Sequence, residues 1–355
     1  MARQGRLSLA SSAWIPGTKF RQHMNTQIDD DKQIVQDLEA AGEKLARVKQ
    51  GISALIFGQD DVIAQSLITI LSGGHALLIG VPGLAKTRLV ETMGTALGLD
   101  AKRLQFTPDL MPADILGSEV LEESDTGKRS FRFIKGPVFC QLLMADEINR
   151  ASPRTQSALL QSMQEHEVTI AGEHYALPQP FHVLATQNPL EQEGTYPLPE
   201  AQLDRFLLQI DVSYPDRDAE KQMLFATTGI DEKSAETVTS AAELLQIQSL
   251  VRRMPVGEQV VDAILALVRS ARPDDDADDL VKTHVAWGPG PRASQALMLA
   301  TRAKALLEGR LSPSVDDVVD LAGPVLRHRM ALSFSARADG VTLQEIIAGL
   351  CARLG

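Results

Sequence analysis

The chain has 355 residues, of which 44% are hydrophobic and 23% charged, so it can bury a core large enough for two or more domains. Its formal net charge of −11 argues against nucleic-acid binding over the whole surface, which needs a positive footprint, although a local basic patch is compatible with it. No apolar run approaches the roughly 18 residues of a membrane-spanning helix. Cys140 and Cys351 have neither metal nor redox spacing, which predicts reduced thiols in a cytoplasmic protein.

The N-terminal residues 1–33 are expected to form a poorly ordered extension. Arg3 and Arg6 precede a short apolar stretch that weakly imitates a signal peptide, but serines interrupt it. From Ile34 to Gly51 the apolar positions predict a helix. A second helix, capped near Asp60, is expected to lead the chain into an apolar strand at 75–79.

A glycine-rich segment, Gly80–Thr87 with the sequence GVPGLAKT, separates that strand from the next helical stretch. A strand, a glycine-rich turn and a helix that opens with Lys-Thr form the context of a phosphate-binding loop. Backbone N–H groups at the helix N-terminus would bind an anion, Lys86 would reach the β- and γ-phosphates, and Thr87 would bind Mg²⁺. Ala85 stands where glycine is usual before the lysine, but its Cβ removes no N–H donor. Taken alone, the segment could also be an ordinary strand-to-helix turn.

Two hairpins are predicted after a short strand near 104–106. The first spans 118–134 around a turn at 124–127, and the second spans 168–177 around a turn at 171–173. The first hairpin region brings local positive charge to an acidic protein through Lys128, Arg129, Arg132 and Lys135. For any single residue among them, a solvated hairpin face is the simpler interpretation.

Two further apolar strands end in polar side chains. The strand at 138–145 is followed by Asp146 and Glu147, and the strand at 181–186 is followed closely by Asn188. In nucleotide hydrolysis, Asp146 could hold the metal, Glu147 could polarise the attacking water and Asn188 could hydrogen-bond the same water. Without the phosphate-binding loop, the acidic pair could equally be a helix cap.

After a last strand at 207–212 only helices are predicted, near 220–225, 241–251, 258–271, 292–308 and 315–326. This order indicates an α/β domain with a parallel sheet, followed by a small all-α domain. Arginine suits the charge of a phosphoryl-transfer transition state, and the candidates are Arg205 and Arg292. Each alone is more often a surface arginine in an ion pair, but the Gly-Pro turn before Arg292 would aim it into a cleft.

Together these motifs resemble the MoxR-type AAA+ ATPases, in the same order and over roughly residues 34–335. The resemblance implies an αβα nucleotide-binding core at 34–213 with a five-stranded parallel sheet, and a helical lid domain at 214–355. It also implies a homo-oligomeric ring, usually a hexamer, with ATP and Mg²⁺ at the subunit interfaces. The motifs that carry it are Gly80–Thr87, Asp146–Ala151, Ala185–Glu191, Leu203–Phe206 and the turn before Arg292.

The resemblance also implies roles for single residues. Asn188 matches the sensor-1 residue, Arg292 the sensor-2 arginine of the lid, and Arg205 the arginine finger contributed to a neighbour. Hairpin 118–134 matches an insert that faces the central pore, and hairpin 168–177 matches the pre-sensor-1 insert. The expected catalytic residues are Glu147, Asn188, Arg205 and Arg292, and the expected metal ligands are Thr87 and Asp146. The expected nucleotide contacts are Gly80, Val81, Pro82, Gly83, Leu84, Ala85, Lys86, Thr87 and Arg88, with Phe57, Gly58 and Gln59 beside the adenine.

The resemblance implies a chaperone-like ATPase that remodels protein complexes, commonly beside a protein with a von Willebrand factor A domain, and helps metalloenzymes mature. Two alternatives stay open: a nucleic-acid motor of the helicase-like ring type, which shares the hairpin inserts, and a magnesium-chelatase-type motor subunit. The acidic composition disfavours nucleic acid as the partner. The presence of both Asp146 and Glu147 argues against a scaffold that binds nucleotide without hydrolysing it.

Overall fold

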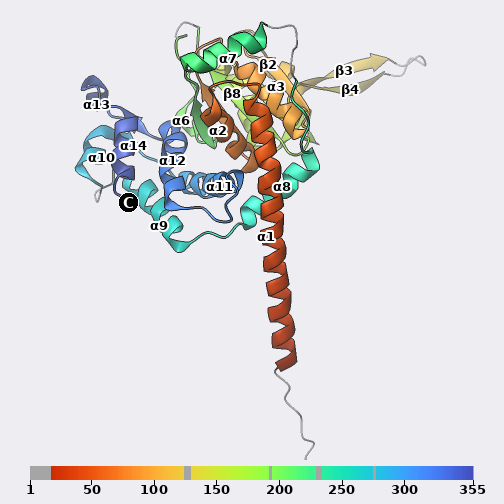
Figure 1. The fold of residues 1–355 in the computed structure, drawn as a ribbon. Helices are drawn as coiled ribbons and strands as arrows, with labels where there is room; N and C mark the ends of the chain where they lie inside the picture. Colours follow the sequence, from red (N-terminus) through yellow and green to blue (C-terminus); the bar gives the residue numbers. More distant parts are fainter. Residues whose placement is uncertain (1–16, 124–128, 192–193, 229–233, 275–276, 355) are drawn as a thin grey trace, which may run out of the picture.

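The computed structural model describes residues 17–354 apart from 124–128, 192–193, 229–233 and 275–276, and a parallel five-stranded sheet lies at its centre (Figure 1). The strand order is β2-β5-β8-β1-β9, and every neighbouring pair is parallel. The α/β class and the parallel sheet are therefore confirmed. The strands are β1 (Ala76–Ile79), β2 (Ala101–Gln105), β5 (Leu142–Asp146), β8 (His182–Gln187) and β9 (Leu208–Asp211).

Helices cover both faces of this sheet. Successive strand residues point to opposite sides, so each strand contributes apolar side chains to both faces. In β1, Ala76 and Leu78 belong to one buried apolar cluster, whereas Leu77 belongs to another. The first cluster also includes residues of helices α1, α2, α3, α8, α9, α11 and α12, and the second includes residues of α5. Coverage of both faces explains why the strands read as continuous apolar runs. The core helices are α1 (Gly17–Ser53), α2 (Asp60–Leu71), α3 (Lys86–Leu97), α4 (Pro112–Leu116), α5 (Pro153–Glu165) and α6 (Glu200–Leu203), with the 3₁₀ turn η1 (Ile148–Arg150).

The C-terminal part is mainly helical, and its helices pack against α1 and α2 in the first apolar cluster. The five helices predicted from the sequence are present as α7, α8, α9, α11 and α12. The sequence prediction missed α10, α13, α14 and a small antiparallel pair, β10 with β11, all of which are short. The elements are α7 (Arg217–Thr227), α8 (Ala241–Arg253), α9 (Glu258–Ser270), α10 (Asp279–His284), β10 (Val285–Trp287), α11 (Pro291–Leu307), α12 (Val315–Leu326), the 3₁₀ turn η2 (Arg327–Arg329), β11 (Ala331–Leu332), α13 (Phe334–Ala338) and α14 (Leu343–Cys351).

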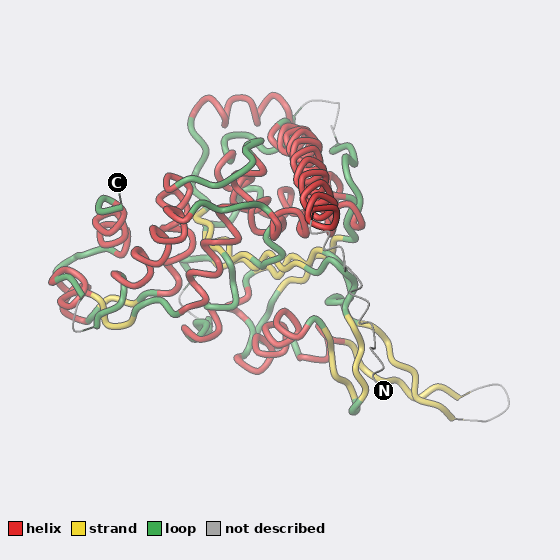
Figure 2. The backbone as a smooth tube through the Cα atoms, turned by 90° about the horizontal axis from the view of Figure 1, so that it is seen from below, coloured by secondary structure: helices red, strands yellow, loops and turns green. Residues whose placement is uncertain are grey.

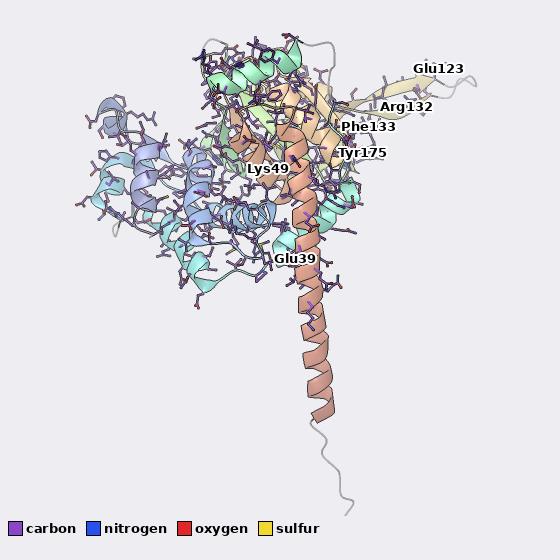
Figure 3. All side chains as sticks on the ribbon, in the orientation of Figure 1. Glu39, Lys49, Glu123, Arg132, Phe133 and Tyr175 are labelled. Carbon is purple, nitrogen blue, oxygen red and sulfur yellow. The ribbon has the colours of Figure 1, made fainter. Side chains whose placement is uncertain are left out.

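Both predicted hairpins are present. β3 (Gly117–Glu123) and β4 (Arg129–Lys135) form an antiparallel ribbon that projects from the body, and β6 (Glu167–Ile170) pairs with β7 (Glu173–Ala176) (Figure 1). The turn predicted at 124–127 lies outside the described residues. Phe133 of β4 stacks on Tyr175 of β7 with ring centroids 4.2 Å apart, so the two hairpins touch at their bases (Figures 2 and 3).

Helix α1 begins at Gly17, within the segment that we expected to be a poorly ordered extension, and its N-terminal part extends well beyond the body (Figure 1). Residues 17–33 are thus helical where we expected a poorly ordered extension, and residues 1–16 lie outside the described part. Neither proline nor glycine interrupts the chain from 18 to 41, so nothing in its composition stops the helix predicted from Ile34 from extending backwards. No helix in the described ranges combines the length and apolarity needed to cross a membrane.

Candidate active site

The glycine-rich segment forms the connection between β1 and α3. Gly83 has a positive φ of 86°, and a Cβ on Gly80 would come 2.7 Å from the carbonyl oxygen of Val212, so both positions suit glycine. Ala85 is also left-handed, with φ 55°, and it caps α3 without a side-chain hydrogen bond to the helix N-terminus. A left-handed residue that carries a Cβ costs about 1–2 kcal/mol. The strained turn leaves the first N–H groups of α3 available to an anion.

Lys86, the first residue of α3, lies near the acidic pair at the end of β5. Its ammonium group donates to the carbonyl oxygen of Gly80. Burial lowers the pKa of Lys86, while the negative charges of Asp146 and Glu147 oppose this change. Lys86, which is predicted to contact phosphate, is therefore close enough to interact electrostatically with Asp146 and Glu147. These are the two acids predicted to serve the metal and the water. Thr87 follows Lys86 in the first turn of the same helix.

One buried hydroxyl fixes both acids at the end of β5. Thr186 Oγ1 donates to Asp146 Oδ1 over 2.7 Å and accepts from the backbone N–H of Glu147 over 2.9 Å. Glu147 itself has a left-handed backbone with φ 56°, so this hydrogen bond holds a conformation that is unfavourable for a residue with a Cβ. Thr186 has a side-chain role that the sequence analysis did not assign.

Two residues of β2 meet the same acids. Arg103 donates to Asp146 Oδ2 from Nη2 over 2.6 Å and from Nε over 3.2 Å, and Gln105 Nε2 donates to Glu147 Oε2 over 2.7 Å. The Glu147 oxygen also accepts from Arg150 Nη1 over 3.0 Å. These donors satisfy oxygens of both carboxylates and fix where they lie. Alternation along β2 places Arg103 and Gln105 on one side of the strand, but the sequence does not reveal that β5 lies beside it.

Asn188 follows β8, whose residues Thr186 and Gln187 lie in register with Leu78 and Ile79 of β1. Its side chain is buried, and its amide oxygen accepts from the backbone N–H of Leu190 over 3.1 Å. The amide nitrogen is therefore the group that Asn188 can direct towards a phosphate oxygen or a water. The parallel sheet thus brings the glycine-rich loop, the acidic pair and Asn188 to one edge, as predicted.

A pocket of about 240 Å³ adjoins the glycine-rich loop. The loop and the first turn of α3 contribute Pro82, Gly83, Leu84, Ala85 and Arg88, while Leu55, Ile56, Phe57, Gln59, Tyr214, Pro215, Glu220 and Met223 form the other walls. Gly58 forms the turn between two lining residues with φ 66°, where a Cβ would come 2.5 Å from the Ala219 Cβ. The apolar walls beside a phosphate-binding loop have the character expected of an adenine pocket.

The two candidate arginines lie elsewhere. Arg205 and Arg292 line a second pocket, of about 280 Å³, together with Gly73, Gly74 and His75, which precede β1. This pocket is therefore at the edge where β1 begins, whereas the glycine-rich loop is at the edge where β1 ends. Arg292 Nη1 forms an ion pair with Asp204 Oδ2 at 3.6 Å. The sequence analysis grouped Arg292 with the phosphate site, but the structure does not bring it to the chain's own Lys86.

Comparisons with known proteins decide the family. Residues 75–208 match the model of the ATPase family associated with various cellular activities (AAA), and residues 277–350 match the AAA lid domain. Chaperone MoxR1 of Mycobacterium tuberculosis is 41% identical over 311 residues, which cover 87% of this chain and 81% of that protein. The chain belongs to the MoxR family of AAA+ ATPases.

Two further relatives agree with this assignment. Protein MoxR of Paracoccus denitrificans is 30% identical over 335 residues, covering 87% of this chain and 92% of that protein. A crystal structure described as a candidate ATPase from Cytophaga hutchinsonii matches with a TM-score of 0.83 at 35% identity, and the match covers 91% of this chain and 97% of that one. This MoxR-family ATPase therefore has the AAA+ core and helical lid that its motifs implied.

Proposed function

We propose that this MoxR-family ATPase binds ATP with Mg²⁺ at the loop edge of its sheet and hydrolyses it. The observation that carries the proposal is the convergence of an uncapped helix N-terminus, Lys86, Asp146 and Glu147 beside an apolar pocket. Mg²⁺ is commonly held by one or two carboxylates together with substrate phosphates, which fits Thr87 and Asp146 as its protein ligands. When bound, the ion neutralises phosphate charge.

The residues of this edge divide the work of hydrolysis. The N–H groups of α3 and Lys86 bind the phosphates, and Glu147 accepts a hydrogen bond from the attacking water and orients it. Asn188 donates its amide N–H to the same water or to a phosphate oxygen. Thr186, Gln105 and Arg150 hold the acids in place before nucleotide arrives.

Completion of this site requires a neighbour. Arg205 and Arg292 lie at the opposite edge of the sheet from the chain's own Lys86, so they are suited to the nucleotide of an adjoining subunit. A repeated head-to-tail contact of this kind forms a ring when its rotation closes, and we propose that it closes as a hexamer. Arg205 would supply positive charge to the transition state, and Arg292 beside it would bind the same phosphates.

Hydrolysis in this ring would remodel a protein client, in keeping with the chaperone name of the 41% identical relative. Arg129 and Arg132 of the projecting hairpin form ion pairs with Glu123 and Glu122, which disfavours phosphate backbones as ligands. We therefore favour a protein client over nucleic acid, with a von Willebrand factor A domain protein as partner and metalloenzyme maturation as the process.

A pair of variants tests the hydrolysis proposal. Lys86→Ala should abolish nucleotide binding, because Lys86 contacts phosphate in the ground state. Glu147→Gln should bind ATP with near wild-type affinity but hydrolyse it at least roughly 10²-fold more slowly, because a neutral amide cannot polarise the attacking water as a carboxylate does. Fluorescent-nucleotide titration and phosphate release measure the two effects. Wild-type turnover by Glu147→Gln would contradict the role given to Glu147.

A further inference from the structure

Arg329 in the 3₁₀ turn η2 is a buried arginine, and the whole residue has only 2% of its surface exposed. An arginine carries five N–H donors in a planar fork. Here Nε donates to Asp204 Oδ1 over 2.7 Å, and Nη1 donates to the carbonyl oxygens of Val325 and Leu207 over 2.6 and 3.1 Å. Nη2 donates to the carbonyl oxygens of Phe206 and Asp204 over 2.7 and 3.4 Å. All five donors are used.

Four of these five hydrogen bonds end on the short segment 204–207 that carries Arg205. They fix the backbone on both sides of Arg205, at Asp204 and at Phe206. The neighbouring His328 adds a hydrogen bond from Nε2 to the Phe206 carbonyl oxygen over 2.9 Å. The Arg205 guanidinium itself makes no hydrogen bond or ion pair with any described residue. The free Arg205 guanidinium is therefore attached to a backbone segment that the buried Arg329 guanidinium holds in place.

Asp204 extends this arrangement to the second arginine. Its Oδ1 accepts from Arg329, and its Oδ2 pairs with Arg292 at the start of α11. One carboxylate thus lies between the buried guanidinium of η2 and the exposed one of α11. The side chains of Arg329 and Arg292 are 3% and 50% exposed, so the first is fixed and the second faces the pocket.

We propose that Arg329 is a positioning residue that holds Arg205 directly, and Arg292 through Asp204, in the orientation needed for the nucleotide of the adjoining subunit. The inference rests on the proposed action of both arginines in trans. The physical reason is preorganisation, since displacement of a catalytic group by about 1 Å can cost roughly 10²-fold in rate. Arginine is suited to the role because its planar fork reaches several carbonyl oxygens at once, which the point charge of lysine does not.

The test replaces Arg329 with Met, which keeps apolar bulk, and with Lys, which keeps the charge. Both variants should bind ATP like wild type in their own phosphate-binding loop but lose roughly 10²-fold in kcat, with KM nearly unchanged. Arg327→Gln is the matched control. It removes an ion pair between the same turn and Asp211, without touching segment 204–207, and should keep wild-type kcat.

Mixed assemblies separate positioning from a general structural role. Arg329→Met mixed with Lys86→Ala should recover activity, because the first variant keeps an intact loop and the second keeps an intact Arg205 segment. Arg329→Met mixed with Arg205→Ala should recover none, because no subunit in that mixture has a functional Arg205 segment. If Arg329→Met only weakened its own fold, the mixture with Lys86→Ala would stay inactive, and that result would overturn the proposal.

A second variant covers the case in which Arg329→Met does not assemble. Asp204→Asn keeps the shape of the side chain but removes the charge between Arg329 and Arg292, and it should lower kcat and be complemented by Lys86→Ala. If folded Asp204→Asn and Arg329→Lys rings kept full kcat, the positioning role would be refuted, whereas the proposed action of Arg205 in trans would not be affected. Full kcat in Arg205→Ala rings would instead refute the proposed action of Arg205 and leave Arg329 nothing to position.

Discussion

Two residues at the proposed reaction edge, Ala85 and Glu147, adopt positive φ angles although both carry a Cβ. Ala85 turns the chain so that α3 begins with free N–H groups, and Glu147 is the residue at which the chain leaves β5. Such backbone strain persists only where the surroundings hold it. For Glu147 the surroundings are explicit, because its N–H is bound by the Thr186 hydroxyl, which also binds Asp146.

Replacement of Thr186 by Val should therefore damage both stability and turnover. It leaves a buried N–H and a carboxylate oxygen without their partner, at a cost of about 1–3 kcal/mol per unsatisfied group. We expect a lower melting temperature and a kcat reduced roughly tenfold or more, because Glu147 loses its fixed orientation. Thermal unfolding and steady-state ATP hydrolysis measure these effects. Thr186→Ser keeps the hydroxyl and should behave nearly as wild type, so equal kcat in the Val and Ser variants would show that the hydroxyl does not orient Glu147.

The sequence allowed prediction of the residues that end parallel strands, because such ends meet at one edge of a sheet. Asp146 and Asn188 were assigned to one hydrolysis site because each follows a predicted apolar strand, and Lys86 because it opens the helix after the glycine-rich turn. Arg103 was missed because its contact with Asp146 requires β2 to lie beside β5. The two residues are some 40 positions apart in the chain, so the sequence does not reveal this pairing. Arg329 was missed because a basic Arg-His-Arg run usually indicates a solvated surface.

Among the elements, the projecting hairpin differs most from its sequence interpretation. The four basic residues at 128–135 suggested positive charge, but β3 and β4 carry three acidic and three basic residues, and two of the arginines pair across the strands. Lys128 lies outside the described residues. Exposed apolar side chains accompany these paired charges: Leu121 and Phe131 face each other across the strands and are 53% and 70% exposed. Phe133, on the same face, packs on Tyr175 at the base (Figure 3).

A hairpin with exposed apolar side chains and paired charges should bind apolar segments of a protein. We expect the double variant Leu121→Ser with Phe131→Ser to lose most of the stimulation that an unfolded polypeptide such as casein gives, measured as the ratio to each variant's own basal rate. The matched variant Arg129→Gln with Arg132→Gln should keep that stimulation. The opposite pattern, with DNA stimulation that falls steeply as salt rises, would favour a nucleic-acid motor, because counterion release produces that dependence.

At the scale of the whole molecule, the C-terminal helices pack on the α1 and α2 side of the sheet, which takes Arg292 to the edge where β1 begins. Motif order predicted a lid after the core, but not where the lid packs. That position depends on contacts of α8 and α11 with α1 and α2, which are far apart in the sequence. The result is a subunit whose loop edge and arginine edge are separate, and which is suited to head-to-tail contacts.

This separation makes a prediction about mixed rings. Arg205→Ala should lose roughly 10³-fold in turnover while it still binds nucleotide, by analogy with other arginine fingers. In an equal mixture with Lys86→Ala, about a quarter of the interfaces would combine an intact loop with an intact Arg205, so a comparable fraction of wild-type activity should return. Absence of recovery, with co-assembly shown by differential tags, would contradict action in trans.

Arg292 gives the sharper form of this experiment, because a lid arginine could serve either its own subunit's nucleotide or a neighbour's. If Arg292 acts in its own subunit, neither Arg292→Ala nor Lys86→Ala offers a complete site, and their mixture stays inactive. If it acts beside Arg205 on the adjoining nucleotide, as their shared pocket indicates, the mixture recovers as the Arg205→Ala mixture does. We expect recovery, measured as phosphate release from the co-assembled rings. The doubly substituted chain, Lys86→Ala with Arg292→Ala, mixed with either single variant should give no more activity than that single variant alone, because no interface then holds both parts.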